Sequence, residues 1–249
     1  MWPVSILRNT CEGWNLTPSP SVENFDQAEW QRSQKRQALA YHFLSECFYR
    51  VPGKDWFSTL CDQNLFAGWP FQAEADSTKA GLTILAAYCD SWDSTKIGEL
   101  EWDYNQLFVG PGEMYAPPWE SVHQSKTGLT FQDSTFRIRE LYHEFSLQAP
   151  EVHREPDDHI ALELAFVAQL SDLAFVVEDQ TDSLQLNRYL QAQRKILGDH
   201  LFQWAPACLK LVDTHAATDY YRGVAQLTMG CLEESGRLCG LDTETIFSV

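Results

Sequence analysis

Apolar side chains recur every three and four residues along most of the chain, which is the spacing of one face of a helix. In the first such segment they are Leu39, Phe43, Leu44, Cys47 and Phe48. Further helices are predicted over residues 55–66, 76–92, 94–108, 133–145, 156–177, 184–211 and 220–238, with a break near residues 204–206. The chain has no sustained alternation of apolar and polar residues, which would predict a strand. We therefore expect an all-α fold, a single helical domain of about eight or nine helices.

The segment over residues 160–177 is apolar on nearly every side, so we expect a central helix that the others surround. Residues 1–26 contain three prolines and show little periodicity. We therefore predict an N-terminal extension over residues 1–26, draped over the body, and a helical domain over residues 27–249.

A long loop is predicted over residues 109–130, stiffened by three prolines. It carries Met114, Tyr115 and Trp119, and Trp102 lies just upstream. A loop with this much apolar surface either folds back into the core or offers that surface to a ligand. Prolines lower the entropy lost on ordering such a loop, which suits a preformed groove. The pattern alone leaves both interpretations open.

The passage Glu155-Pro156-Asp157-Asp158-His159 precedes the central helix. Carboxylates at a helix start accept unpaired backbone N–H groups and are stabilised by the positive end of the helix. Capping is therefore one interpretation. The other is that Asp158 and His159 project to a surface site and bind a cationic or polar group there.

The chain has 18 Lys and Arg against 35 Asp and Glu, a formal net charge of −17. This sign disfavours a nucleic-acid groove, which needs cations, and it disfavours anionic membrane surfaces. The N-terminus does not have the pattern of a signal peptide, and no apolar run is long enough for a membrane span. The seven cysteines are widely spaced, so we expect reduced thiols in the cytoplasm, several of them packed as small hydrophobes.

Motifs for cofactors and metals do not match. The triplet Gly110-Pro111-Gly112 follows a helix and lacks a third glycine, and the segment 52–55 lacks the residues of a phosphate loop. The seven histidines are scattered. We therefore expect no cofactor and no metal site.

Two separated motifs nevertheless resemble those of one family. They are the run Tyr104-x-x-Leu107-Phe108-Val109-Gly110-Pro111-Gly112 with Ala116-Pro117-Pro118-Trp119-x-Ser121-Val122, and the later Glu155-Pro156-x-Asp158-His159. Together they resemble the TorD/DmsD family of cytoplasmic redox-enzyme maturation chaperones, most closely its DmsD branch. The resemblance extends over residues 38–232. His123 departs from it, since the family commonly has tyrosine there.

The resemblance implies a TorD-like all-α fold without catalytic turnover. It implies binding of the twin-arginine leader of a molybdenum-cofactor oxidoreductase of the dimethyl-sulfoxide-reductase type, held until cofactor insertion and Tat export. Components of the Tat translocase are a further candidate partner. By position, the leader-binding residues would be Tyr104, Leu107, Phe108, Pro118, Trp119, Ser121, Asp158 and His159.

The physical pattern agrees with this implication, because a leader of two arginines and an apolar stretch needs acid and aromatic surface. Two alternatives stay open. One is a nucleotide-binding hydrolase that uses Asp158 and His159 for acid–base chemistry. The other is a helical assembly subunit that binds the mature client rather than its leader.

Overall fold

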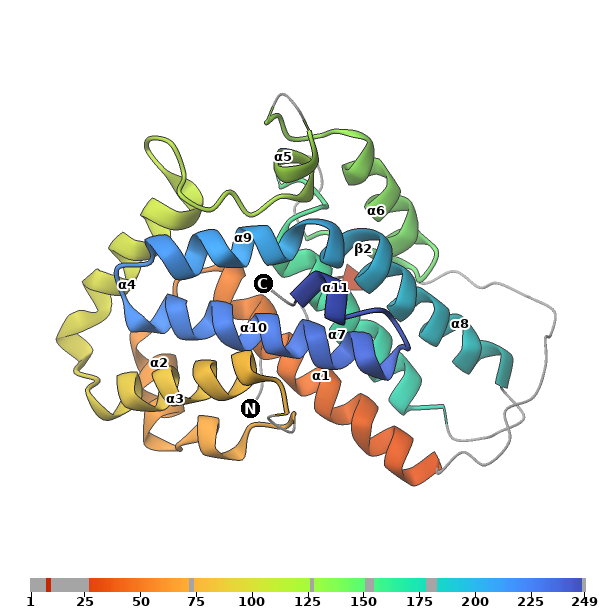
Figure 1. The fold of residues 1–249 in the computed structure, drawn as a ribbon, viewed down its shortest axis with the longest axis horizontal. Coiled ribbons are helices and arrows are strands. Elements are labelled where there is room, and N and C mark those ends of the chain that lie inside the picture. The colour runs from red at the N-terminus through yellow and green to blue at the C-terminus, as the bar shows by residue number, and fades with distance from the viewer. Residues whose placement is uncertain are drawn as a thin grey trace.

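The computed structural model describes residues 8–9, 27–71, 74–125, 128–150, 155–177 and 183–247 (Figure 1). The predicted extension over residues 1–26 lies outside the described residues, except for the strand β1 (Arg8–Asn9). This strand pairs antiparallel with β2 (Leu147–Gln148), with Arg8 opposite Gln148. All else that is regular in the described part is helical, as the periodicity predicts.

The helices follow the predicted order with small shifts at their ends. They are α1 (Gln27–Tyr49), α2 (Lys54–Asp62), α3 (Asp76–Asp90), α4 (Ile97–Tyr104), α5 (Glu120–Gln124), α6 (Asp133–His143), α7 (Ile160–Phe175), α8 (Ser183–Lys195), α9 (Phe202–His215), α10 (Asp219–Leu238) and α11 (Glu244–Phe247). Nine of these eleven have eight residues or more, which confirms the all-α prediction for the described residues. The short α5 and α11 were not predicted.

Shorter helical turns join several of these elements. Two are 3-10 turns, η1 (Leu65–Gly68) and η2 (Ser94–Lys96), and two are π turns, η3 (Asn105–Val109) and η5 (Ile196–Leu201). The turn η5 joins α8 to α9 without a break, and Pro206 lies inside α9. The predicted break at residues 204–206 is therefore wrong, because burial of Trp204, Cys208 and Leu209 favours a continuous helix over the loss of one backbone hydrogen bond at the proline.

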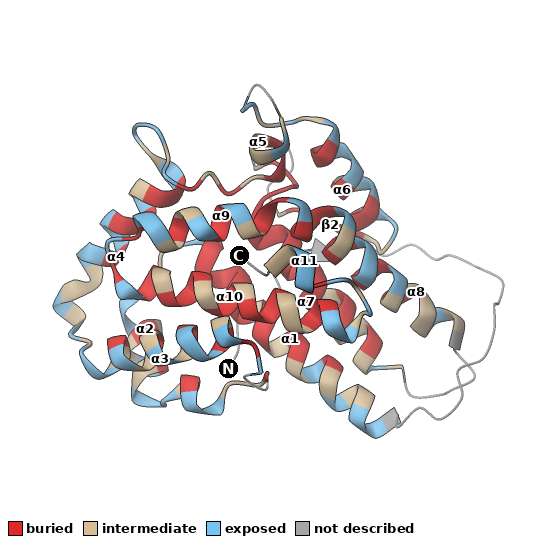
Figure 2. Cartoon of the chain, in the orientation of Figure 1, coloured by how far each residue is buried: buried red, intermediate tan, exposed pale blue. Residues whose placement is uncertain are grey.

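Helix α7 is the centre of the molecule, as predicted, and 12 of its 16 residues are buried. Helix α1 packs along it, α8 covers another side, and α10 packs against both α3 and α9. In Figure 2 the buried residues lie mainly on α1, α7, α9 and α10, where these helices face one another. No helix among the described residues meets the length and hydropathy that a bilayer span requires.

Glycines let α3 and α10 approach closely. A Cβ atom added at Gly81 would lie 2.5 Å from the backbone nitrogen of Leu227, and one at Gly230 would lie 2.5 Å from that of Thr78. Neither atom can move away without shifting a helix. The two glycines therefore fix the spacing of this helix pair, which forms one side of the core.

The cysteines differ from the prediction in one respect. Cys61 of α2 and Cys89 of α3 form a disulfide, with Cα atoms 4.9 Å apart, so the expectation of reduced thiols is wrong for this pair. The two cysteines are 28 residues apart in the sequence, and this spacing alone does not predict that their helices are adjacent. Cys47, Cys208 and Cys231 are buried free thiols, as predicted. Cys11 lies outside the described residues.

Candidate functional site

The fold brings the two sequence motifs into direct contact. Trp119 and His159 form an isolated antiparallel bridge. The Ile160 N–H donates to the Pro118 carbonyl at 2.8 Å, and the Glu120 N–H donates to the Asp158 carbonyl at 3.0 Å. Chain segments 40 residues apart are thus held in register at the start of the central helix.

Trp119 is half-buried and held on two sides. Its indole Nε1–H donates to Glu155 Oε1 at 2.7 Å, and its ring meets the His159 ring edge-on with centroids 5.8 Å apart. The Tyr49 ring, at the end of α1, also meets the His159 ring edge-on, with centroids 6.3 Å apart. We call Tyr49, Trp119, Glu155 and His159 the Trp119 face.

Asp158 is fully buried, and both of its carboxylate oxygens accept hydrogen bonds. Its Oδ2 accepts the Ser121 N–H at 2.7 Å, and its Oδ1 accepts the Thr135 hydroxyl at 2.9 Å. Ser121 lies in the first turn of α5 and Thr135 in the first turn of α6. One carboxylate therefore accepts a backbone N–H of α5 and a side-chain hydroxyl of α6, and ties both helix starts to the loop before α7.

His159 is the N-cap of α7. Its Nδ1 accepts the Ala161 N–H at 3.1 Å, and burial lowers the pKa of the imidazole from 6.5 to about 3. The ring is therefore neutral and fixed by its cap bond. The predicted start of this helix at residue 156 is four residues early, because residues 157 and 158 form a turn that leads into the cap.

The first motif, which begins at Tyr104, contacts the end of α1 next to Tyr49. Leu107 and Phe108 are buried in the π turn η3, and the Tyr104 hydroxyl donates to the Phe48 carbonyl at 3.1 Å. The carbonyls of Gln106 and Leu107 accept the N–H groups of Tyr115 and Ala116, at 3.1 and 3.0 Å. The π turn thus receives the returning loop, which Gly110 begins at a φ of +103°.

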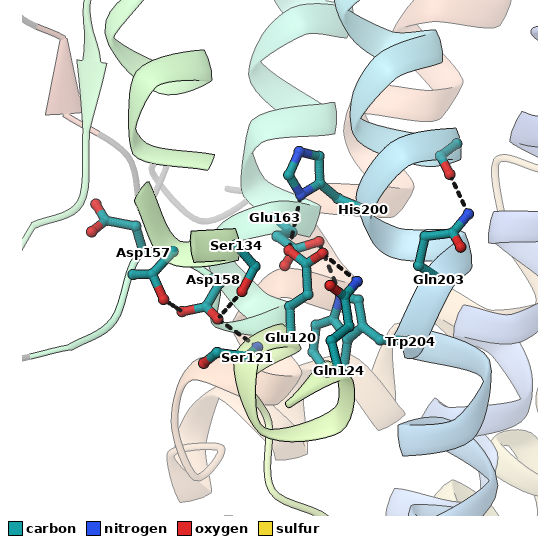
Figure 3. Close-up of polar contacts among 12 residues, drawn as sticks. Glu120, Ser121, Gln124, Ser134, Asp157, Asp158, Glu163, His200, Gln203 and Trp204 are labelled. Atoms are coloured by element: carbon teal, nitrogen blue, oxygen red, sulfur yellow. Dashed lines mark hydrogen bonds and ion pairs between the residues drawn. The ribbon is translucent and has the colours of Figure 1, made fainter. Parts of the chain in front are cut away.

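A buried polar cluster connects α5 to η5 and α7 to α9 (Figure 3). Glu120 Oε2 pairs with His200 Nδ1 at 2.9 Å, and its Oε1 accepts from Gln124 at 2.6 Å. Glu163 accepts from the indole of Trp204 at 3.3 Å, and its other oxygen has no partner among the described residues. Burial, helped by the charges of Glu120 and Asp158, raises the pKa of Glu163 well above its usual value, which favours the neutral acid.

Part of the loop's apolar surface faces solvent. Trp102 is 56% exposed and Tyr115 is 46% exposed, the latter stacked on the His215 ring with centroids 5.2 Å apart. The apolar residues in and before the loop therefore do not all belong to the core or all to an open surface. Leu107, Phe108 and Pro118 are core, whereas Trp102 and Tyr115 are exposed and Trp119 lies at the boundary.

Of the eight predicted site residues, only Trp119 is partly exposed. The others support it: Tyr104, Leu107, Phe108, Pro118, Ser121, Asp158 and His159 are all buried. Asp158 and His159 are both engaged as helix caps, which is not the arrangement that the hydrolase alternative needs. Among the described residues no group of three metal-ligating side chains comes together.

Sequence reasoning did not select several residues that shape the site. Tyr49 is a helix-end aromatic with no motif around it, and Glu120, Glu163 and His200 come from three separate elements. Only Glu155 had a signal, since it begins the second motif. Pairings between distant elements have no signature in a single sequence.

Comparisons with known proteins agree on one family. Residues 72–210 match the family described as nitrate reductase delta subunit. The Tat proofreading chaperone DmsD of Salmonella typhi is 28% identical over 194 residues, covering 76% of this chain and 84% of its own length. The chaperone protein TorD of Vibrio cholerae is 31% identical over 136 residues, covering 55% and 60%.

Proposed function

Because this chain belongs to the nitrate reductase delta subunit family, which includes the TorD and DmsD chaperones, we propose that it is a redox-enzyme maturation chaperone. Its client is a molybdenum-cofactor oxidoreductase of the dimethyl-sulfoxide-reductase type. In the cytoplasm it binds the client's twin-arginine leader and holds it until cofactor insertion and Tat export.

One observation carries this proposal most directly. Trp119 presents a half-buried indole whose position is fixed by Glu155 on one side and by the neutral His159 ring on the other. A rigid aromatic with a carboxylate beside it suits a ligand that is both cationic and apolar. A twin-arginine leader has this chemistry, with two guanidinium groups followed by apolar residues.

The buried motif residues then act as positioning residues. Asp158 and Ser121 fix the turn that follows Trp119, and Tyr104 fixes the end of α1 beneath Tyr49. The exposed Trp102 and Tyr115 extend the apolar surface along the loop. Burying about 400 Å² of apolar leader surface would contribute about 10 kcal/mol before the cost of ordering the peptide. The net affinity is then micromolar or submicromolar, which permits release.

Calorimetric titration of the full chain with a Tat leader peptide tests the proposal. We expect saturable binding of an Arg-Arg leader and at least about tenfold weaker binding of its Lys-Lys version, since lysine cannot form bidentate bonds. Absence of binding to the Tat leaders of molybdenum oxidoreductases from the same organism would contradict it.

The assembly-subunit alternative has an observation of its own. Leu129, Phe131 and Phe136 are exposed by 60%, 43% and 53%, at and before the start of α6, and none belongs to the Trp119 face. Exposed apolar side chains suit contact with the surface of a folded client. Titration with a client that lacks its leader separates the two functions, because only the assembly role predicts unchanged affinity.

A further inference from the structure

A second feature lies at the end of α1, close to Tyr49 in the sequence. It is a cavity of about 460 Å³ between the end of α1, the link to α2 and the start of α10. Its walls are mainly apolar, with one acid and one base: Glu46, Cys47, Arg50, Val51, Pro52, Gly53, Trp56 and Tyr220. The volume is within the range of side-chain and small-ligand sites.

The acid and the base in this cavity are paired with each other. Arg50 Nε donates to Glu46 Oε2 at 2.7 Å, and a second guanidinium nitrogen contacts the same oxygen. The two side chains differ sharply in exposure, with 9% of the Glu46 side chain exposed and 66% of that of Arg50. Among the described residues, Arg50 is the only cation paired with Glu46.

The two partners of this ion pair differ in how much they depend on it. An Arg side chain that is two-thirds exposed gains little from an ion pair, since it is nearly as well solvated when it swings away. The Glu46 side chain lines the cavity and is only 9% exposed, so its carboxylate has less access to water than the Arg50 guanidinium. The site therefore holds an acid with a replaceable guanidinium partner, beside the Trp56 ring and the Val51 side chain.

The same turn of α1 also supports the Trp119 face. Phe48 receives the Tyr104 hydroxyl through its carbonyl, and Tyr49 packs on His159. Glu46 and Arg50 thus lie within one helical turn of Tyr49 along the chain. The step from the Trp119 face to this cavity is therefore part of the proposal that follows.

We propose that Glu46 is the acid that receives a leader arginine, and that Arg50 is the resident competitor which that arginine displaces. The inference rests on the proposed function and adds the residue that reads the guanidinium. The aliphatic part of the incoming arginine packs along Trp56 and Val51, and its guanidinium takes the place of the Arg50 group on Glu46. Exchange of one arginine for another keeps the ion pair and releases Arg50 to solvent.

The two members of the pair predict opposite effects, which calorimetric titration of an Arg-Arg leader peptide measures. Arg50→Ala removes the competitor, so we expect about threefold tighter binding. Glu46→Gln removes the receiving charge, so we expect about tenfold weaker binding and loss of the preference for Arg-Arg over Lys-Lys. Structural damage does not mimic the first result, because damage lowers affinity.

A matched pair on α10 controls for net charge. Arg237 and Glu233 form an ion pair with the same i, i+4 spacing, on a different helix and away from the cavity lining. Arg237→Ala changes the charge of the chain as Arg50→Ala does, and Glu233→Gln matches Glu46→Gln. Both controls should bind the leader as the unaltered chain does.

The outcomes separate this inference from the proposed function. If the unaltered chain binds the leader but Arg50→Ala and Glu46→Gln change the affinity no more than their controls, the Glu46 site is wrong and the chaperone function stands. If the unaltered chain binds no Tat leader, the proposed function itself fails. Circular dichroism melting of each variant establishes that it is folded.

Discussion

At the scale of single residues, the second motif has a structural role that its composition hides. Asp158 and His159 resemble an acid–base pair in sequence, yet each accepts backbone N–H bonds at a helix start. Between them they accept backbone N–H groups of α5 and α7, and Asp158 also accepts the Thr135 hydroxyl of α6. The sequence predicts capping as one of two interpretations, and burial decides for it, because a fully enclosed carboxylate cannot reach a ligand.

Replacing Asp158 tests this role. Asp158→Ala leaves the Ser121 N–H and the Thr135 hydroxyl without their acceptor, so we expect a loss of about 2–4 kcal/mol in the free energy of unfolding. Urea denaturation measures it. Asp62→Ala, at an exposed position at the end of α2, should change the value by less than about 0.5 kcal/mol. Equal small effects of both substitutions would exclude this structural role of Asp158.

His159 predicts a pH dependence of stability. The folded imidazole has a pKa of about 3, whereas in the unfolded chain it returns to about 6.5, so between these values the unfolded state binds more protons. The free energy of unfolding therefore falls as the pH drops from about 6.5 towards 3, by up to about 1.4 kcal/mol per pH unit from this residue.

The contribution of His159 is isolated by substitution. His159→Asn retains an N-cap acceptor without a titrating group, so we expect a shallower loss of stability between about pH 6.5 and pH 4.5. Guanidinium unfolding at several pH values in that range gives the slope. An unchanged slope in the variant would show that the buried imidazole does not titrate as proposed.

At the scale of elements, periodicity predicts the helices well and their junctions poorly. The apolar segment over residues 160–177 becomes the central helix α7, since a helix without a polar face must be enclosed. The junctions depend on contacts between distant segments. The π turns, the Cys61–Cys89 disulfide and the short α5 each need a partner that the local pattern does not name.

Two glycines give an element-scale prediction of opposite sign. Gly81→Ala places a methyl group 2.5 Å from the α10 backbone, so we expect destabilisation by more than about 2 kcal/mol. Gly98 lies in the first turn of α4, and a Cβ there meets nothing within 4 Å. Gly98→Ala should therefore stabilise the chain by up to about 1 kcal/mol through helix propensity. Thermal melting compares them, and matching shifts would refute the close α3–α10 contact.

At the scale of the whole molecule, the net charge of −17 favours a cationic client. The family and its fold class are predictable from two motifs and from helical periodicity. The predicted leader-binding set stays a prediction, and the structure divides it by burial: seven of its eight members are buried and Trp119 is partly exposed. A motif marks residues that a function needs, and burial determines whether they touch the ligand or hold those that do.

The overall charge predicts a salt dependence of leader binding. We expect the affinity for an Arg-Arg leader to fall by about threefold or more between about 0.05 and 0.5 M NaCl, since screening weakens attraction between exposed charges. Titration at several salt concentrations measures it. An affinity that does not change with salt would mean that apolar contacts alone hold the leader.

The most direct test of the account is amide hydrogen exchange of the full chain with and without an Arg-Arg leader peptide. We predict that the leader slows exchange at the end of α1 around Tyr49, in the loop around Trp119 and at the start of α7. Helix α8 and the α3–α10 contact should exchange as before. Slowed exchange confined to α8 or α11, or none anywhere at saturating leader, would contradict binding at the Trp119 face.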